Sequence, residues 1–287
     1  MNDLEGAIAE SLGVKSVEIE GLQSGALSST GRVIVPGDDV AFLKRVTGAP
    51  PDQLPAEGRG LDLMRATGAV KVPRVLAVSP DFLILEQLRA APSTPKAGAR
   101  LGRELAAMHR TTSEAWGLDF TTYCGRTPQP AGWSPSLISH FRDDRIGLMR
   151  STLGRQGTLP KELEHGLERI QERMDHWLGD LDEAPALVHG DLWGGNWVNT
   201  PGDVPYLIDP SPTYGFREVD LAMSELFGGF PLEFQRAYRQ EFPLADGYEM
   251  RRPLLNLYPL LNHAVLFGGG YFAQSQRAVS LLASEVG

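Results

Sequence analysis

The chain has 287 residues, of which 42% are hydrophobic and 22% are charged, and its formal net charge is −9. This composition is typical of a soluble globular protein, and the length suits one large domain or two modest ones. The acidic balance and the lack of any run rich in Lys or Arg argue against nucleic acid and anionic membranes as partners. A single cysteine, Cys124, excludes an intrachain disulfide and a cysteine-based zinc site.

Neither a secretory signal nor a membrane span is expected. The first ten residues are acidic and lack the apolar stretch of a signal peptide. No run reaches the about 20 apolar residues that a transmembrane helix needs. We therefore expect a cytoplasmic protein.

The first 88 residues are expected to form a small, mostly β lobe. Strands are predicted at residues 16–22, 32–35, 40–46, 72–78 and 82–85, and helices at 3–12 and 57–67. The turns between the first three strands carry Gly and Ser. Pro92 and Pro95 mark the expected boundary between this lobe, residues 1–88, and a second lobe, residues 89–287.

The second lobe reads as helical. Apolar residues recur with the helical period over three stretches: residues 101–108, 163–177 and 219–226. Residues 251–266 predict a buried helix, interrupted or kinked at Pro253 or Pro259, and the glycines at 268–270 predict its C-terminal stop. Five histidines in or beside helical patterns are expected to pack or face solvent: His109, His140, His165, His176 and His263.

The segment 187–209 contains an ordered set of polar residues on a predicted loop and hairpin. Asp191 follows the end of a buried strand, so its carboxylate lies on an anchored loop within reach of a substrate. Asn196 comes five residues later. Two short apolar runs around the turn at 201–203 predict a hairpin, which returns the chain and brings Asp209 near Asn196.

This arrangement indicates phosphoryl transfer. In kinases one carboxylate orients and deprotonates the attacking hydroxyl, while an amide oxygen and a second carboxylate hold Mg²⁺ on the ATP phosphates. We assign Asp191 as the base and Asn196 and Asp209 as Mg²⁺ ligands, because this ion keeps several waters and needs few protein ligands. Taken singly, His189 could cap the loop and each Asp could be a turn or helix cap. The ordered combination favours the kinase interpretation.

The order of elements predicts an α+β, bilobal protein-kinase-like fold. A small antiparallel-sheet, nucleotide-binding N-lobe (1–88) would precede a larger helical catalytic and substrate C-lobe (89–287). ATP would lie in the cleft between the lobes.

The N-lobe offers candidates for the nucleotide. Residues 23–31 form a Gly/Ser loop between two predicted strands, which can bring backbone N–H groups to phosphates, although most such loops are plain turns and no Walker A sequence is present. Lys44 on the next strand and Glu57 on the following helix could form the pair that positions the α- and β-phosphates, or be unpaired surface residues. The segment 86–88 could offer backbone groups to adenine or be a plain linker.

Several segments together resemble the fructosamine kinase (ketosamine-3-kinase) family, which belongs to the kinase-like phosphotransferases that include the aminoglycoside and choline kinases. The resemblance runs from about residue 17 to 278. It is carried by the motifs HGDLWGGN, TPQP and REVDLAM and by their surroundings: residues 106–112, 125–133, 187–197, 207–230 and 257–271.

The resemblance implies ATP-dependent phosphorylation of a sugar hydroxyl on free or protein-bound ketosamines, with Mg²⁺. The 3-phosphate makes the adduct labile, so that the amine is freed. By resemblance the base is Asp191 and the metal ligands are Asn196 and Asp209. The nucleotide site would contain Gly25, Ser28, Ser29, Lys44, Glu57, Glu86, Gln87 and Leu88. Trp193 would be the aromatic wall of the sugar-amine site, unless it is a core residue behind the loop, and His189 and Asp220 would give structural support.

The chain departs from the family pattern at three places. Ala131 replaces the usual Asn, Phe216 replaces the usual His, and the Gly-rich loop is irregular. Cys124 lies outside this loop, so no redox switch is expected there. Two alternatives remain: a kinase for another small alcohol, as in the aminoglycoside or choline kinases, and a nucleotide-binding pseudokinase.

Overall fold

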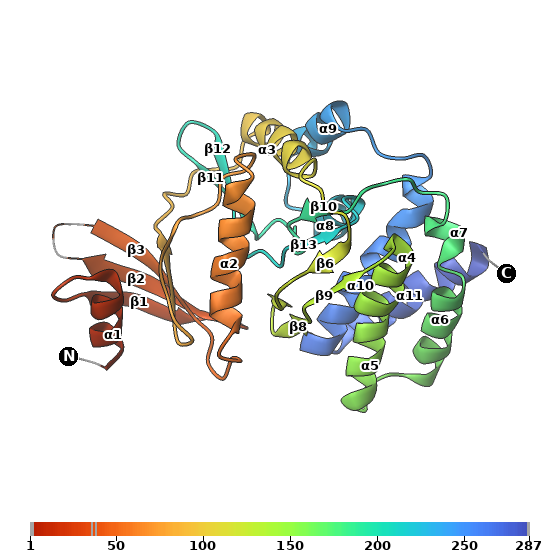
Figure 1. The fold of residues 1–287 in the computed structure, drawn as a ribbon, viewed down its shortest axis with the longest axis horizontal. Helices are drawn as coiled ribbons and strands as arrows, with labels where there is room; N and C mark the ends of the chain where they lie inside the picture. The colour runs from red at the N-terminus through yellow and green to blue at the C-terminus, as the bar shows by residue number, and fades with distance from the viewer. Residues whose placement is uncertain (1–2, 36, 38, 286–287) are drawn as a thin grey trace.

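The computed structural model describes residues 3–35, 37 and 39–285. Its N-terminal part is a five-stranded antiparallel sheet of order β1-β2-β3-β5-β4 with two helices (Figure 1). The strands are β1 (Glu18–Ser24), β2 (Ser29–Val35), β3 (Asp39–Arg45), β4 (Val75–Val78) and β5 (Leu83–Glu86), and the helices are α1 (Asp3–Leu12) and α2 (Gln53–Ala66). Val33 of β2 and Leu43 of β3 are buried with Ile8 of α1. On the other face of the sheet, Leu83 and Leu85 of β5 are buried in a cluster that includes residues of α2.

The C-terminal part is mainly helical. Its helices are α3 (Pro95–Met108), α4 (Leu137–Ser139), α5 (Leu148–Arg155), α6 (Lys161–Glu172), α7 (Asp175–Leu178), α8 (Glu218–Phe227), α9 (Leu232–Glu241), α10 (Tyr248–Phe267) and α11 (Gly270–Glu285), with a π-helical stretch, His140–Gly147, between α4 and α5. A small sheet of order β10-β13-β6-β9 unites β6 (Trp116–Leu118), β9 (Gly132–Ser134), β10 (Ala186–Val188) and β13 (Thr213–Gly215). Two separate hairpins complete the C-terminal part: β7 (Thr122–Cys124) with β8 (Thr127–Gln129), and β11 (Trp197–Thr200) with β12 (Val204–Leu207).

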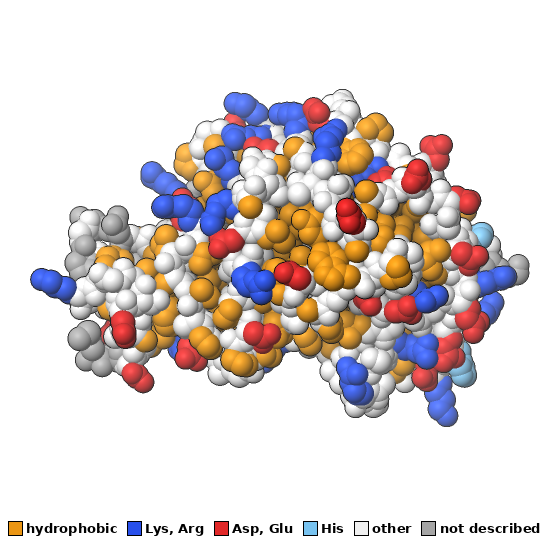
Figure 2. Space-filling model, in the orientation of Figure 1, with side chains coloured by type: hydrophobic (Ala, Val, Ile, Leu, Met, Phe, Trp, Pro, Cys, Tyr) orange, Lys and Arg blue, Asp and Glu red, His pale blue; other side chains and the backbone are white. Residues whose placement is uncertain are grey.

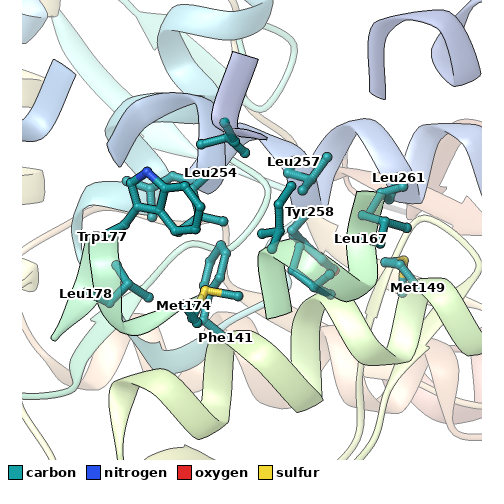
Figure 3. Packing of buried hydrophobic residues seen from close by; sticks show 14 of the residues in the cluster. Phe141, Met149, Leu167, Met174, Trp177, Leu178, Leu254, Leu257, Tyr258 and Leu261 are labelled. Carbon is teal, nitrogen blue, oxygen red and sulfur yellow. The ribbon is translucent and has the colours of Figure 1, made fainter. Parts of the chain in front are cut away.

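The largest core lies around α10. In Figure 3, Leu254, Leu257 and Leu261 of α10 face Phe141 and Met149, and Trp177 packs at one end. The face in Figure 2 carries basic and acidic side chains interspersed, with hydrophobic atoms exposed between them over β6 and β9. Among the described residues, no helix is both long and apolar enough to cross a membrane.

The predicted α+β, kinase-like fold is confirmed, although the structure adds helices α5, α9 and α11 and strands β6 to β9 and β13 to the predicted elements. Three predicted helices also differ in detail. Helix α2 begins at Gln53, a full turn before the predicted start, so Glu57 lies inside the helix. The stretch 163–177, predicted as one helix, forms two, α6 and α7. The sequence suggests a single helix because Trp177 of α7 packs into the same core and continues the apolar period across the break. Helix α10 runs uninterrupted through Pro253 and Pro259, with most of its residues buried.

Candidate active site

The loop that follows β10 is fixed by one buried carboxylate. Asp220, in the first turn of α8, accepts hydrogen bonds from the backbone N–H groups of His189 (2.7 Å) and Gly190 (2.9 Å). Gly190 has a φ of 79°, and a Cβ at this position would lie 2.0 Å from the carbonyl oxygen of Ser211. Only glycine therefore fits beside Asp191 in this conformation. These are the contacts that the predicted supporting role of Asp220 requires.

A second buried layer holds Asp220 itself. His109 Nε2 lies 3.1 Å from Asp220 Oδ2, and His109 Nδ1 lies 2.8 Å from the Tyr238 hydroxyl. Burial favours the protonated carboxyl, but the hydrogen bond and charge of His109 outweigh it and keep the pKa of Asp220 below its ordinary value. The sequence patterns predicted only packing or exposure for His109, because nothing local links it to a residue so distant in the chain.

Asp191 and Asn196 are hydrogen-bonded to each other. Asn196 Nδ2 donates to the Asp191 carbonyl oxygen (2.8 Å) and to its Oδ2 (3.0 Å). Because the amide nitrogen is used in this way, the amide oxygen of Asn196 is left as a ligand for a cation. Burial raises the pKa of Asp191 to about 7, and the nearby Asp209 charge adds to the rise. A carboxyl tuned in this way suits a general base near neutral pH.

The predicted hairpin is confirmed and brings Asp209 to the same place. Strands β11 and β12 pair in the register Trp197↔Leu207, and Ile208 N–H donates to the Asn196 carbonyl (3.0 Å). His189 Nε2 lies 3.0 Å from the carbonyl of Ile208, which ties the hairpin to the loop of Asp191. Asp209 has a φ of 52°, a left-handed conformation that is costly for a non-glycine residue and is common at functional sites.

Lys44 and Glu57 form the predicted pair. Lys44 Nζ, on β3, donates to both carboxylate oxygens of Glu57, on α2, at 2.8 and 2.9 Å, and lies 3.1 Å from Asp209 Oδ2. Burial opposes the charged ammonium, but Asp209 and Glu57 outweigh that cost and raise the pKa of Lys44. The alternative of two unpaired surface residues is wrong.

These residues line one cavity of about 200 Å³ between the N-terminal sheet and the C-terminal part. Its walls include Lys44, Glu57, Asp191, Asn196 and Asp209. Ser28 of the Gly/Ser loop and Trp193 also line it. Trp193 is 43% exposed, so it is not a core residue behind the loop.

The other predicted nucleotide residues, Gly25, Ser29 and 86–88, are not among the residues that line the cavity. Gly25 closes the β1–β2 turn by donating to the carbonyl of Ser28 (2.7 Å), and Ser29 begins β2. Glu86 ends β5, where its carboxylate accepts from the backbone of Arg74, and the chain then continues through Gln87 and Leu88 toward α3.

The donor set suits Mg²⁺. The described residues contain no cluster of three or more His, Cys, Asp or Glu placed to hold a metal ion. One carboxylate, Asp209, and one amide oxygen, Asn196, lie on the same cavity. Such a sparse pair of hard oxygen ligands fits an ion that takes its other ligands from phosphates and water.

The fold and this constellation define a kinase-like phosphotransferase. The structure of an aminoglycoside phosphotransferase with bound ADP shares the fold, with a TM-score of 0.65 at 14% identity over 98% of this chain and 99% of that chain. A “putative fructosamine-3-kinase” from Thermobifida fusca superposes with a TM-score of 0.88 at 31% identity over 99% of both chains.

Sequence comparison gives the family. The fructosamine kinase family model matches residues 3–285. A probable ketoamine kinase from Synechocystis sp. is 37% identical over 262 residues, 88% of this chain and 86% of the relative. A probable ketoamine kinase from Escherichia coli K12 is 34% identical over 232 residues, 79% of each chain. The chain therefore belongs to the fructosamine kinase family, whose members are phosphotransferases with an alcohol group as acceptor.

Proposed function

We propose that this protein is an ATP- and Mg²⁺-dependent kinase that phosphorylates a sugar hydroxyl of ketosamines, free or protein-bound, as a step in deglycation. The observation that carries the proposal is the convergence of Asp191, Asn196, Asp209, Lys44 and Glu57 on one cavity. The relatives named probable ketoamine kinases support the acceptor class. ATP as substrate and the free thiol of Cys124 suit the cytoplasm.

In this proposal the residues have separate roles. Asp191 accepts the proton of the acceptor hydroxyl while the hydroxyl oxygen bonds to the γ-phosphorus of ATP. The bond between the γ-phosphorus and the oxygen of the leaving ADP breaks in the same step. Lys44, held by Glu57, binds the α- and β-phosphates. Asp209 and Asn196 would hold Mg²⁺, and the ion would neutralise charge on the phosphates. The raised pKa of Asp191, about 7, makes it a stronger base than an ordinary aspartate.

The nucleotide lies between two lobes in this proposal, residues 1–88 and 89–287. The turn with Gly25, Ser28 and Ser29 covers the phosphates, and backbone groups of residues 86–88 contact adenine. Ser28 lines the cavity beside Lys44, which supports the phosphate assignment.

The acceptor lies on the other side of Asp191. The half-exposed indole of Trp193 offers a face for a sugar or a cationic amine. Asn262, a buried side chain that lines the cavity, keeps an amide oxygen without a hydrogen-bond partner among the described residues. A free hydrogen-bond acceptor of this kind suits a ligand rich in hydroxyl and N–H donors, such as a ketosamine.

The test is ADP release with Mg-ATP and a synthetic fructosamine or ribulosamine, comparing the wild type with Asp191→Asn. We expect wild-type turnover and a loss of at least about 100-fold in kcat in the variant, because general base catalysis typically contributes that much. Turnover only on an aminoglycoside or choline would replace the acceptor class. Nucleotide binding without turnover on any acceptor would favour the pseudokinase alternative.

A further inference from the structure

The β7–β8 hairpin reaches from the C-lobe to the N-lobe across the edge of the active-site cavity. Its strands pair in the register Tyr123↔Pro128 and Cys124↔Thr127, so Gly125 and Arg126 form the turn. The base of the hairpin is fixed in the C-lobe, because Arg145 Nη1 donates to Gln129 Oε1 (3.1 Å). Figure 1 shows β8 near the first turn of α2, at the junction of the two parts of the chain.

The turn of this hairpin is bonded to the start of α2. Gln53 Nε2 donates to the carbonyl of Gly125 (2.8 Å), and the Tyr123 hydroxyl donates to Asp52 Oδ1 (2.8 Å) at the N-terminal cap position of α2. Gln53 is 6% exposed, so its bond is shielded from water. Gln53 lies one helical turn before Glu57 and on the same face, so a hold on Gln53 also fixes the partner of Lys44.

The same turn touches the Gly/Ser loop. Arg126 Nη2 donates to the carbonyl of Leu27 (3.4 Å). A Cβ at Gly125 would lie 3.1 Å from the Leu27 side chain and 2.8 Å from that of Leu266, so both side chains pack against the turn. The hairpin thus contacts both N-lobe elements that are assigned to the nucleotide, α2 and the β1–β2 turn.

The other face of the hairpin meets the catalytic loop. The Cys124 thiol accepts a hydrogen bond from Asn262 Nδ2 (3.0 Å), and Cys124 lines the same cavity as Asp191. Tyr123, Cys124 and Gly125 all line the cavity. A ligand beside Asp191 therefore rests against the element that holds α2.

We propose that the β7–β8 hairpin is an interlobe latch in which Gln53 and Tyr123 are positioning residues for the nucleotide site. Through Cys124 the latch also forms part of the acceptor side, so nucleotide and acceptor each stabilise the latched arrangement and strengthen each other's binding. This inference rests on the proposed function for the identity of the two ligands. Such coupling is reciprocal and is measured as a ratio of dissociation constants.

The first test is ADP binding by calorimetry to the wild type and to the double variant Gln53→Leu, Tyr123→Phe. We expect each lost hydrogen bond to weaken ADP binding by up to about fivefold. Tyr206→Phe, which removes a hydroxyl on β12 away from the cavity lining, is the matched control and should bind ADP as the wild type does. Equal ADP affinity in the wild type and the double variant overturns the latch.

The second test measures the coupling. In the wild type a saturating synthetic fructosamine should lower the Kd for ADP. The ratio of the Kd for ADP without fructosamine to the Kd with it should therefore exceed one, and in the double variant it should move toward one. A ratio that is one in the wild type, or unchanged in the double variant, overturns the acceptor link. If fructosamine does not bind at all, the acceptor assignment fails, while the ADP comparison still decides the latch.

Hydrogen exchange tests the latch without either ligand. In the double variant the amides of Gln53, Leu54, Ala56 and Glu57 at the start of α2 should exchange faster than in the wild type, because two side-chain hydrogen bonds that hold this turn are lost. Unchanged exchange there, measured on the intact chain, overturns the latch independently of the reaction.

Discussion

In the active-site loop, position 190 has no room for a side chain larger than that of glycine. Replacing Gly190 with Ala adds a methyl group 2.0 Å from the carbonyl of Ser211 at a φ of 79°. Gly157 has a similar φ of 67° but no atom within 4 Å of its Cβ position. We expect Gly157→Ala to cost about 1 kcal/mol of unfolding free energy from backbone strain alone, and Gly190→Ala about 3 kcal/mol or more, because the clash adds to the strain.

Urea unfolding of both variants gives this comparison, and ADP release reports the displacement of Asp191. Equal losses of stability would show that the loop moves freely around residue 190 and that the carbonyl of Ser211 imposes no restriction.

At the same scale, the sequence predicts those site residues that lie close together in the chain. Asp191, Asn196 and Asp209 are joined by a loop and a hairpin, so turn chemistry and strand pattern suffice to place them together. The layer formed by His109, Tyr238 and Asp220 has no such local signal, since its members come from different helices. A buried imidazole between a carboxylate and a phenol is visible only once the helices are packed.

Among the elements, the start of α3 is linked to the hairpin that positions Asp209. Thr94 Oγ1 accepts from the backbone N–H of Ala97 (3.0 Å) and donates to Asp203 Oδ1 (2.7 Å) in the β11–β12 turn. Thr94→Ala removes the helix cap and this link, and we expect a loss of about 1 kcal/mol of unfolding free energy.

Thr94→Ser keeps the hydroxyl and is the control, expected within about 0.5 kcal/mol of the wild type in urea unfolding. If Ser and Ala lower the stability equally, the methyl group of Thr94 matters and the capping hydroxyl does not.

The existence of elements could be predicted better than their limits. The five strands predicted for the N-terminal part are all present, because apolar and β-branched residues bounded by turn residues are a local property of each run. Helices α5, α9 and α11 are not among the predicted elements. Strands β6 to β9 and β13 are not among them either, since three residues are too few to show a period and their pairing depends on partners elsewhere in the chain. The first turn of α2 escaped prediction for the same reason: Gln53 is held by Gly125, 72 positions away.

Across the whole molecule, the active site concentrates negative charge in an acidic protein. Glu57, Asp191 and Asp209 surround the single ammonium of Lys44 on one cavity. Neighbouring carboxylates that lack a cation repel one another and lower the stability of the fold. The site is therefore suited to binding a cationic ligand. This surplus of negative charge matches a ligand that brings Mg²⁺ and an amine, as the proposed substrates do.

The free energy of unfolding should fall in mild acid, and His140 should account for a measurable part of that fall. His140 is 3% exposed in the C-lobe core, and burial together with the Arg145 charge lowers its pKa to about 4, although Asp144 at 3.2 Å favours the charged form. In the unfolded chain a histidine titrates near 6.5. Between these values the unfolded state binds more protons, so stability is lost as the pH falls from about 6.5 to 4.

His140→Gln lacks this titration. Asp144, which contacts His140 and whose pKa lies below its ordinary value, stays ionised from pH 7 to pH 5, and the groups that do not contact His140 titrate in both proteins and cancel in the comparison. Between pH 7 and pH 5 the wild type should lose on the order of 2 kcal/mol more than the variant, because each pKa unit corresponds to about 1.4 kcal/mol. Urea unfolding of both proteins at the two pH values measures the difference. Parallel losses would mean that His140 accepts its proton at the ordinary pH, with Asp144 rather than burial deciding its charge.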